Sequence, residues 1–382
     1  MKMGIIVFAY NRSWHLQKVL NGLKENNGVK KLYIFQDGLK CETDRQEWEA
    51  TQNVINNINW CEIIYELSKE NKGLAESIVY GVNKVFEENE AVIVLEDDCV
   101  PQPAFINYMK QCFHEYQNNR KVYSISGYSW PIEIKRDESD IYFCGRPCPW
   151  GWGTWKDRWS LYKRDYQMIL DIKSKKESSK RLAAWGNDLE DMLVSNIKGI
   201  TDSWYVFWSL LLIKNDGYAI NPYESLIQNE GFDGTGVHCS KTNRFDTNIL
   251  GGEKSNQTFK LPTQIDINLQ VKEKFIDLYG SYVIDNYDEK KSDVLVYGVG
   301  SYYKRNAKQI SNNYNIIAFV DKFRKDKFYA GINIIQPKQI NEIKFDYIII
   351  AIENLKMSQN IKKELIKAYG VECKKIKIGL DE

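Results

Sequence analysis

The chain of 382 residues lacks any hydrophobic run long enough to cross a membrane. Its first apolar run, residues 4–9, gives way at once to polar Asn11 and Arg12, so it fits neither a signal peptide nor a membrane span. We therefore expect a cytoplasmic protein. The length exceeds what one hydrophobic core usually serves, which predicts two domains.

The sequence also lacks an excess of charge of either sign. Lys and Arg number 52 and Asp and Glu number 51, so the net charge is +1. Without a positive field, no nucleic acid partner is expected. Histidine is scarce, at three residues, and the eight cysteines form no C-x-x-C pair, which favours reduced thiols. An irregular zinc set stays an alternative: Cys144, Cys148, His238 and Cys239.

Regular alternation of apolar and amphipathic segments is present in the first 130 residues. It is typical of parallel strands joined by helices, with strands expected at 4–9, 32–35, 62–65 and 91–95 and helices over 14–24 and 74–86. Ligands bind at the carboxyl edge of such sheets. The segments that follow the strands should therefore meet there: residues 10–12, Asp37, residues 71–73 and residues 96–98.

Three acidic residues, Glu96, Asp97 and Asp98, end the fully apolar strand at 91–95. Adjacent carboxylates repel one another unless a cation or hydrogen-bond donors compensate. Mn²⁺ or Mg²⁺ suits this role because such hard ions take oxygen ligands and bridge them to phosphate, which stabilises a leaving nucleotide. The alternative is that Asp97 or Asp98 caps a helix starting near Pro103.

Three other residues at the predicted edge have two interpretations each. Asp37 could accept hydrogen bonds from a nucleobase or ribose, or hold the Asp-Gly turn. Arg12 could pair with phosphate or make a surface ion pair. Lys72, before Gly73 at a helix start, is placed to meet phosphate or ribose.

Three segments together resemble glycosyltransferases of the GT-A fold: Phe8-Ala9-Tyr10-Asn11-Arg12, Asn71-Lys72-Gly73-Leu74-Ala75 and Val94-Leu95-Glu96-Asp97-Asp98-Cys99-Val100-Pro101. They are most similar to bacterial family-2-like enzymes of surface-polysaccharide assembly. The Glu-Asp-Asp form also resembles the N-acetylglucosaminyltransferase that begins complex N-glycan branching. The resemblance covers about residues 3–245 and implies an α/β fold with a Rossmann-like mixed sheet.

The resemblance implies a metal-dependent, inverting transfer of a sugar from a UDP-sugar to a glycan or a lipid-linked acceptor. Asp98 would bind the metal, Asp97 would face the ribose or the sugar, and Asp37 would face the nucleobase. The nucleotide cleft would also include Tyr10, Asn11, Arg12, Lys72, Gly73 and Glu96. His238, in a Gly-rich loop, could bind metal or diphosphate, or be structural.

Aromatic residues are abundant, with 11 Trp and 24 Tyr, and four indoles lie between Trp150 and Trp159. Indoles stack on sugar rings, although an aromatic core under a loop fits equally. Similar segments in the relatives favour an acceptor or sugar wall, for which the candidates are Trp150, Trp152, Trp155 and Trp204.

An inverting transferase needs a carboxylate base, for which Asp202 is preferred and Asp191 is the second candidate. Two other functions stay open. A nucleotidyltransferase would also use acidic metal ligands, but it would open with a Gly-rich loop after the first strand. A non-catalytic carbohydrate-binding protein could keep the tryptophans without needing the acidic triplet.

The domain plan has three parts: a transferase domain at 1–250, a linker at 251–291 with one helix around 271–278, and a small doubly wound α/β domain at 292–382. Gly298-Val299-Gly300-Ser301 follows its first strand and Asp321 ends the next, as in dinucleotide sites, but the third glycine is absent. This segment resembles the amino-terminal nucleotide-binding half of sugar-modifying enzymes. We expect a binding, regulatory or assembly module.

Two further partnerships stay open. The C-terminal domain could form a homo-oligomer. A basic run, Lys173, Lys175, Lys176, Lys180 and Arg181, could contact anionic lipid on the inner face of the membrane, or be a solvated loop and helix start.

Overall fold

The computed structural model describes residues 1–232, 245–251, 256–265, 267–279 and 290–380. Contacts between Cα atoms divide the chain into two compact units. The first unit contains Met1–Asp165 and Asp191–Lys274, and the second contains Tyr166–Glu190 and Phe275–Glu382. In the described ranges, no helix has the length and apolar character needed to span a bilayer.

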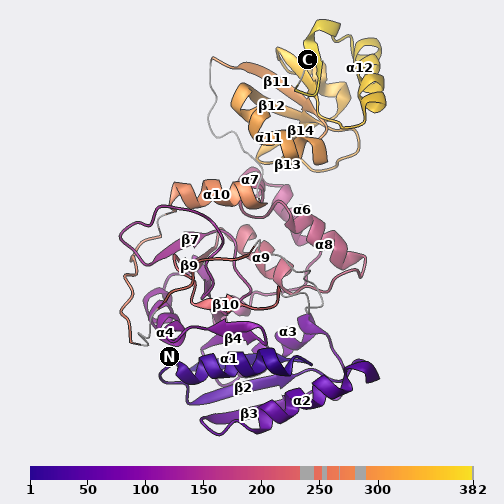
Figure 1. The fold of residues 1–382 in the computed structure, drawn as a ribbon. Coiled ribbons are helices and arrows are strands. Elements are labelled where there is room, and N and C mark those ends of the chain that lie inside the picture. Colours follow the sequence, from indigo (N-terminus) through magenta and orange to yellow (C-terminus); the bar gives the residue numbers. More distant parts are fainter. Residues whose placement is uncertain (233–244, 252–255, 266, 280–289, 381–382) are drawn as a thin grey trace. The chain divides into compact units, whose positions relative to one another are not determined.

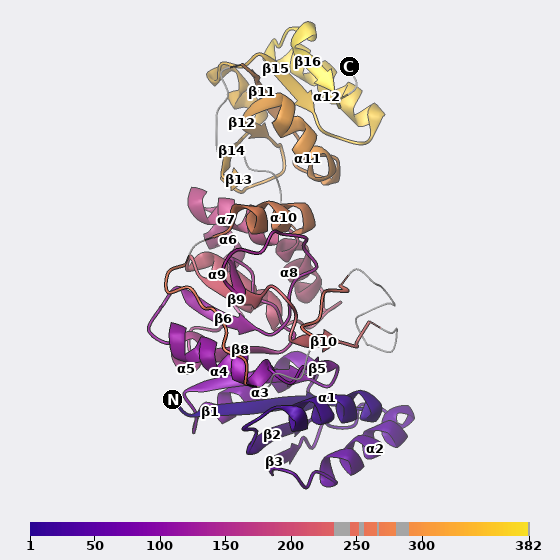
Figure 2. The ribbon, with the colours of Figure 1, turned by 60° about the vertical axis from the view of Figure 1, so that its left-hand side comes forward.

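The first unit is built on a mixed sheet of eight strands in the order β3-β2-β1-β4-β8-β6-β9-β7 (Figures 1 and 2). Strands β3, β2, β1 and β4 are parallel, and β8 pairs antiparallel to both β4 and β6. The bounds are β1 Met3–Ala9, β2 Lys31–Gln36, β3 Glu62–Leu67, β4 Ala91–Glu96, β6 Val122–Ser126, β7 Ile141–Cys144, β8 Trp152–Trp155 and β9 Tyr218–Pro222.

Helices cover this sheet, and a two-stranded ladder of β5 and β10 lies beside it. Helix α1 buries Leu16, Val19, Leu20 and Leu23, the apolar stripe that the helical period predicts. The elements are α1 Ser13–Glu25, η1 Glu42–Asp44, α2 Arg45–Asn56, α3 Leu74–Val85, β5 Cys99–Pro101, α4 Phe105–Tyr116, α5 Lys156–Trp159, α9 Tyr205–Lys214 and β10 Ile227–Asn229. Two helices include residues of both units: α8 Leu189–Ile197 and α10 Leu269–Tyr279.

Strand β8 carries the Trp-Gly-Thr-Trp segment through the middle of the sheet. Its Gly153 has no space for a side chain, because a Cβ atom there would lie 2.7 Å from Met109 Cε and from the backbone oxygen of Val92. The glycine therefore lets α4 and β4 pack closely against β8.

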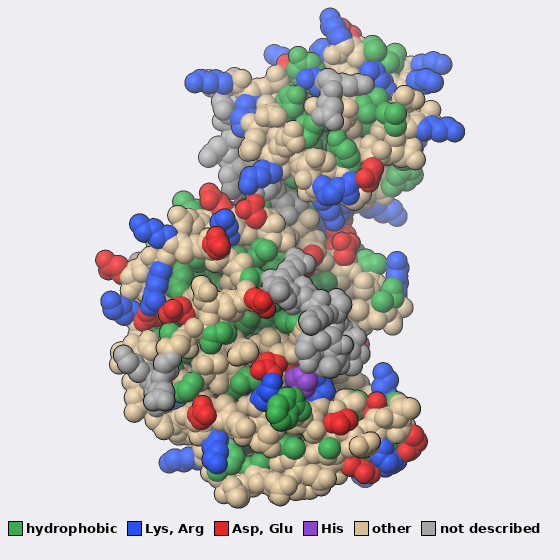
Figure 3. Space-filling model, in the orientation of Figure 1, with side chains coloured by type: hydrophobic (Ala, Val, Ile, Leu, Met, Phe, Trp, Pro, Cys, Tyr) green, Lys and Arg blue, Asp and Glu red, His purple; other side chains and the backbone are tan. Residues whose placement is uncertain are grey.

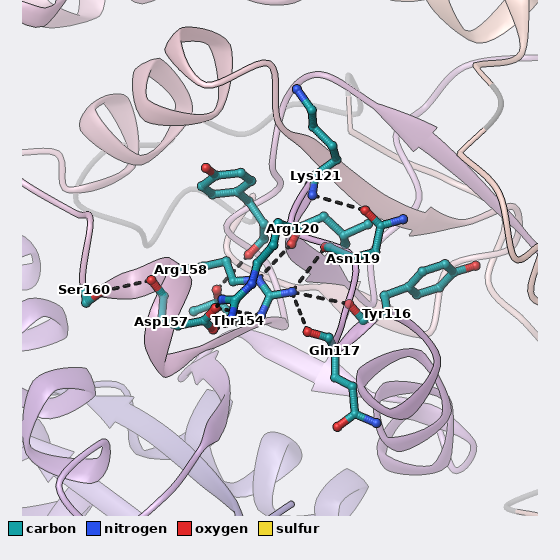
Figure 4. Close-up of polar contacts among 11 residues, drawn as sticks. Tyr116, Gln117, Asn119, Arg120, Lys121, Thr154, Asp157, Arg158 and Ser160 are labelled. Carbon is teal, nitrogen blue, oxygen red and sulfur yellow. Dashed lines mark hydrogen bonds and ion pairs between the residues drawn. The ribbon is translucent and has the colours of Figure 1, made fainter.

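Arg158 follows β8 on α5 and is a buried cation that binds backbone oxygens (Figure 4). Its Nη2 donates to the carbonyls of Gln117 at 2.8 Å and Asn119 at 3.1 Å, and its Nη1 donates to the Asp157 carboxylate at 2.8 Å. Burial, followed by repulsion from Arg120, lowers the pKa of Arg158 to about 10. This side chain satisfies the carbonyls of the turn between α4 and β6.

The second unit has a six-stranded sheet in the order β13-β14-β12-β11-β15-β16. The α11 side chains Tyr303, Ala307 and Ile310 pack on one face, whereas Ile361 and Leu365 of α12 pack on the other. The bounds are α6 Met168–Lys173, α7 Lys176–Gly186, β11 Ser292–Tyr297, α11 Ser301–Asn313, β12 Tyr314–Val320, β13 Phe328–Tyr329, β14 Ile332–Ile335, η2 Pro337–Glu342, β15 Tyr347–Ile350, α12 Leu355–Tyr369, η3 Cys373–Lys375 and β16 Ile376–Ile378.

The predicted fold class is confirmed: a Rossmann-like mixed α/β sheet is followed by a smaller doubly wound α/β sheet. The expected strands and helices of the first 100 residues are present within two residues of their predicted ends. The sequence did not predict that residues 166–190 belong with the second unit.

Candidate active site

The acidic triplet lies where it was expected, at the carboxyl end of β4. Arg12, which follows the neighbouring β1, donates from Nη1 to Asp98 Oδ2 at 2.9 Å and to Asp97 Oδ1 at 3.4 Å. Between 12% and 16% of each of these three side chains is exposed. The first strand and the triplet therefore meet at one partly buried ionic centre, with Tyr10 and Asn11 in the turn before Arg12.

The centre holds more acidic than basic groups. The carboxyl groups of Glu96, Asp97 and Asp98 lie close enough to the single guanidinium of Arg12 to interact with it electrostatically. Burial, and then repulsion from Asp98, raises the pKa of Asp97 to about 7 and that of Glu96 well above its usual range. Such a carboxylate excess at a strand end favours an added cation.

The helix-capping alternative for the triplet is wrong. Helix α4 begins at Phe105, and its N-cap residue is Ala104, which has no side-chain cap. Neither Asp97 nor Asp98 is therefore used to begin this helix. Cys99 directs its thiol to Asp98 Oδ1 at 3.4 Å.

The segment after β10 packs directly on Asp98. The backbone N–H of Glu230 donates to the Asp98 carbonyl at 2.9 Å, and the Glu230 side chain forms an ion pair with Lys18 of α1. A Cβ atom at Gly231 would lie 2.2 Å from Asp98 Oδ2. Glycine at 231 is therefore required for the backbone to approach the triplet, and sequence reasoning missed it.

Asp37, after β2, organises the loop in front of α3. Its carboxylate accepts backbone N–H bonds from Gly38 and Lys72 on Oδ1 and from Gly73 on Oδ2, each at 2.9 Å. Trp48 Nε1 donates to the Asp37 carbonyl at 2.8 Å. Asp37 therefore holds the Asp-Gly turn, as its structural interpretation predicts. The same carboxylate also holds the 71–73 loop at the edge of the sheet, where this loop was expected.

A small pocket opens beside this loop, lined in part by Gln36, Asp37, Ser68, Lys72, Ser77 and Tyr80. The Lys72 ammonium lies 4.0 Å from the centre of the Tyr80 ring, a cation–π contact. Nearby, the Tyr10 hydroxyl donates to Asp44 Oδ2 at 2.7 Å and accepts from the Lys40 N–H at 2.9 Å. Burial, followed by the bond to Asp44, raises the pKa of Tyr10 to about 12.

Asp202, the preferred base, lies at the same edge. A Cβ atom at Gly73 would be 3.9 Å from Asp202 Oδ2, so the carboxylate faces the start of α3. Arg164 donates to Asp202 Oδ1 at 2.5 Å, and 49% of the Asp202 side chain is exposed. No pattern in the sequence indicated Arg164. The second candidate, Asp191, is exposed on α8.

His238 lies outside the described residues, as does Cys239 of the zinc alternative. The two remaining cysteines of that alternative, Cys144 and Cys148, are buried. The Cys144 thiol donates to the Arg146 carbonyl at 2.9 Å. Across the described ranges no three His, Cys, Asp or Glu side chains gather in a metal-binding arrangement.

The four candidate tryptophans divide into two groups. Trp152, Trp155 and Trp204 are at most 3% exposed, and Trp152 stacks on Trp204 with ring centres 4.7 Å apart. These three indoles face the core, as in the aromatic-core alternative. Trp150 is partly exposed and contacts the rings of Tyr128 at 4.7 Å and Phe232 at 5.3 Å. Phe232 follows Gly231, so Trp150 is the candidate near the triplet.

In the second unit, Gly298 follows β11 with a φ of 96°, a conformation that favours glycine, and Gly300 precedes α11 with no atom near its Cβ position. Asp321 Oδ1, after β12, accepts backbone N–H bonds from Phe323 and Arg324. The predicted carboxylate therefore holds its own turn.

Comparison with known proteins gives a family match in the second unit: the model described as C2185-like, N-terminal, matches residues 290–377. No curated protein sequence matches the chain.

Among solved structures, the chain is similar to residues 1–349 of TarS from S. aureus, with 12% identity and a TM-score of 0.37 over 61% of this chain and 62% of that one. It is also similar to the mannosyltransferase PcManGT from Pyrobaculum calidifontis in complex with GDP-Man and Mn²⁺, with 10% identity and a TM-score of 0.29 over 48% and 52%. The chain is also similar to a cytidylyltransferase from Leptospira borgpetersenii, with 13% identity and a TM-score of 0.25 over 35% of this chain and 57% of that one. Each match spans less than two thirds of the other protein's chain.

Proposed function

We propose that the chain is a metal-dependent, inverting glycosyltransferase of the hexosyltransferase type. It would move a sugar from a nucleotide sugar, with a UDP-sugar favoured, to a glycan or lipid-linked acceptor in surface polysaccharide synthesis. The observation that carries the proposal is the ionic centre at the carboxyl edge of β1 and β4, where Arg12 contacts Asp97 and Asp98. This edge is where nucleotides bind in open α/β sheets.

The residues present offer a divalent cation the carboxylate oxygens of Asp97 and Asp98, which are the hard ligands that such an ion takes. Asp98, with support from Asp97 and Glu96, would hold Mn²⁺ or Mg²⁺, and His238 is the expected further ligand. Either ion, when bound, supplies positive charge that stabilises the leaving diphosphate. Arg12 would add donors for phosphate oxygens in a planar pair.

The loop at 71–73 would complete the donor site. Asp37 fixes this loop by accepting hydrogen bonds from the backbone N–H groups of Lys72 and Gly73, which holds Lys72 beside the pocket next to Tyr80. Preformed positions lower the entropy that binding must overcome. Trp150 is the candidate for a sugar wall, since its indole retains exposed surface.

Asp202 would act as the general base. Its carboxylate takes the proton of the acceptor hydroxyl while that oxygen forms a bond to the anomeric carbon, and the bond from this carbon to the diphosphate oxygen breaks. Attack from the side opposite the leaving group inverts the anomeric centre. Arg164, bound to Oδ1, leaves Oδ2 on the side of Gly73.

The division of the chain is part of the proposal: residues 1–250 for transfer, 251–291 as a linker and 292–382 as a binding, regulatory or assembly module. A cytoplasmic location and a homo-oligomer formed through the C-terminal module stay predictions.

Titration calorimetry with a panel of UDP-, GDP- and CMP-sugars, with and without Mn²⁺, tests the proposal. We expect one UDP-sugar to bind, and to bind more tightly with Mn²⁺. Failure of every nucleotide sugar to bind would refute it. For a turnover reaction, NMR of the product anomeric proton distinguishes inversion from retention.

A further inference from the structure

The balanced net charge of the chain hides a strongly basic segment. Residues 290–382 contain 18 Lys and Arg and 10 Asp and Glu. Residues 1–289 contain the remaining 34 Lys and Arg and 41 Asp and Glu. A basic field of this kind attracts an anionic partner. Figure 3 shows blue side chains projecting from the part of the surface formed by this segment.

One loop of this segment combines positive charge with an exposed aromatic ring. Residues 322–327, after β12, read Lys-Phe-Arg-Lys-Asp-Lys. Phe323 is 78% exposed, the highest fraction among the large hydrophobic side chains of the described ranges. Lys322, Lys325 and Lys327 are also exposed.

The loop is held in this conformation by its inward-facing residues. Asp321 Oδ1 accepts from the N–H of Phe323 at 2.9 Å and of Arg324 at 3.1 Å. The Arg324 guanidinium pairs with Asp326 at 2.8 Å, and buried Lys173 pairs with the same carboxylate at 2.9 Å. Phe323 is therefore presented outward by a fixed backbone. Lys173, the first residue of the basic run considered for lipid contact, is instead buried in this network.

The start of α12 extends this surface. Strands β12, β11 and β15 are parallel, so the loops that contain Phe323 and Leu355 follow strand ends at the same edge of the sheet. The two strands, β12 and β15, are two strand spacings, about 10 Å, apart. Lys322 pairs with Glu364 of α12 at 3.4 Å, which joins the loop to that helix. Leu355 is 61% exposed and Met357 is 45% exposed.

The carboxylates nearby are already paired. Glu353 pairs with Arg305 at 2.8 Å, and Glu364 and Asp326 have the partners described above. Within the part of the chain that the structure describes, Lys325 and Lys327 have no carboxylate at ion-pair distance. The surface thus joins apolar side chains to uncompensated lysines.

We propose that this basic apolar edge, formed by Lys322, Phe323, Lys325, Lys327, Leu355 and Met357, docks the protein on an anionic lipid bilayer. Apolar side chains enter the interface while lysines meet the headgroups. Nucleic acid fits less well, because Leu355 and Met357 have no aromatic face on which bases could stack. Docking would bring the enzyme to lipid-linked acceptors, but it is a property of the second unit and does not depend on the transfer reaction.

Co-sedimentation of the full-length protein with vesicles tests the inference, with no nucleotide sugar present. Vesicles of phosphatidylcholine alone are compared with equal parts phosphatidylcholine and phosphatidylglycerol. We expect binding to the anionic vesicles only, weakened by salt. The double variant Lys325→Ala with Lys327→Ala should bind roughly 25-fold more weakly, at about fivefold per lysine. Phe323→Ala should lose about tenfold.

Matched controls distinguish binding through this edge from non-specific electrostatic or hydrophobic binding to the vesicles. Lys344 is exposed and precedes β15 at the opposite edge, so Lys344→Ala should leave binding unchanged; Lys374 is less suitable because it pairs with Glu372 at 2.9 Å. Leu269, at 73% exposure, is the control for Phe323. Circular dichroism and the melting temperature check that each variant folds.

Three results would overturn the inference. The native protein could fail to sediment with anionic vesicles. It could sediment while Phe323→Ala and the lysine double variant bind equally well. It could bind single-stranded DNA and not vesicles, with the same variants weakened, which would make the edge a nucleic acid site.

Discussion

Arg12 and Asp98 are 86 residues apart in the chain, yet Arg12 Nη1 lies 2.9 Å from Asp98 Oδ2 at the edge of two adjacent parallel strands. The pair gives Asp98 a cationic partner, whereas burial and repulsion from Asp98 raise the pKa values of the neighbouring Glu96 and Asp97 carboxyl groups. This difference is the physical basis of the first two predictions.

Asp98→Asn should abolish the stabilisation of the protein by Mn²⁺. In the native protein, a cation that binds only the folded state raises the melting temperature with concentration. The variant should show no such rise. Without metal, the loss of the ion pair with Arg12 and the relief of repulsion on Asp97 change the melting temperature in opposite directions. Differential scanning fluorimetry across a Mn²⁺ series measures both effects. An unchanged Mn²⁺ response in the variant would place the cation elsewhere.

Stability without metal should fall as the pH rises through the range of Asp97. Burial and Asp98 raise the pKa of its carboxyl from 3.8 to about 7, so the folded state binds the proton more tightly than the unfolded chain. The melting temperature should therefore be higher at pH 5 than at pH 8, provided the remaining groups titrate alike, and Asp97→Asn should flatten this slope. Thermal unfolding of both proteins at pH 5 and pH 8 measures this difference. An equal change of melting temperature with pH in Asp97→Asn would contradict the raised pKa of Asp97.

Asp202→Asn should stop transfer and leave nucleotide binding intact. Loss of a general base commonly lowers the rate by about a hundredfold to ten-thousandfold. Asp191→Asn is the matched control, since that residue is an exposed carboxylate on α8. Turnover and calorimetry on the same samples measure the two properties. If the Asp191 variant alone loses turnover, the base is Asp191.

Trp150→Ala and Trp152→Ala should fail in different ways. Trp152 is fully buried and stacks on Trp204, so its truncation should cost about 3–5 kcal/mol of stability. Trp150 is partly exposed, so its change should weaken sugar binding with a smaller loss of stability. Chemical denaturation and calorimetry give the two readouts. Comparable stability losses without any change in sugar affinity would make both indoles structural.

Arg158→Leu should destabilise the first unit by about 3–5 kcal/mol. The change leaves the carbonyls of Gln117 and Asn119 and the carboxylate of Asp157 without the guanidinium. Arg158→Lys should recover part of the loss, because an ammonium reaches fewer of these oxygens. The midpoint of urea unfolding measures both. A midpoint within error of the native value for Arg158→Leu would contradict this role.

Much of the carboxyl edge of β1, β2 and β4 could be predicted because strand ends are encoded locally. The apolar run at 91–95 and the acids that follow it give β4 and the triplet, and the Asp-Gly turn gives the end of β2. The pairing of Arg12 with Asp98 required the sheet order, which no local pattern contains. Gly231 and Arg164 were missed because each acts through a contact with a distant segment.

Composition was misleading in two places. The tryptophans suggested a ligand surface, whereas three of the four candidates fill the core, since an indole's large apolar area also serves packing. The net charge of +1 concealed the basic edge, because an acidic first part of the chain cancels it. Charge counted separately for each expected domain would have revealed it.

Between Arg164 and Asp202 the chain leaves the first unit and returns to it. Residues 166–190 therefore belong to the second unit although residues of the first unit precede and follow them in the sequence. Residues 166–190 contact the C-terminal sheet through Lys173 with Asp326 and Asn187 with Tyr329. Deleting residues 275–382 would remove these partners and expose an inserted segment that starts two residues after Arg164. Inactivity of such a truncated chain would therefore report misfolding next to Asp202, the proposed base, as readily as loss of a second activity. Point changes on the outer surface of the second unit are the cleaner way to study what it does.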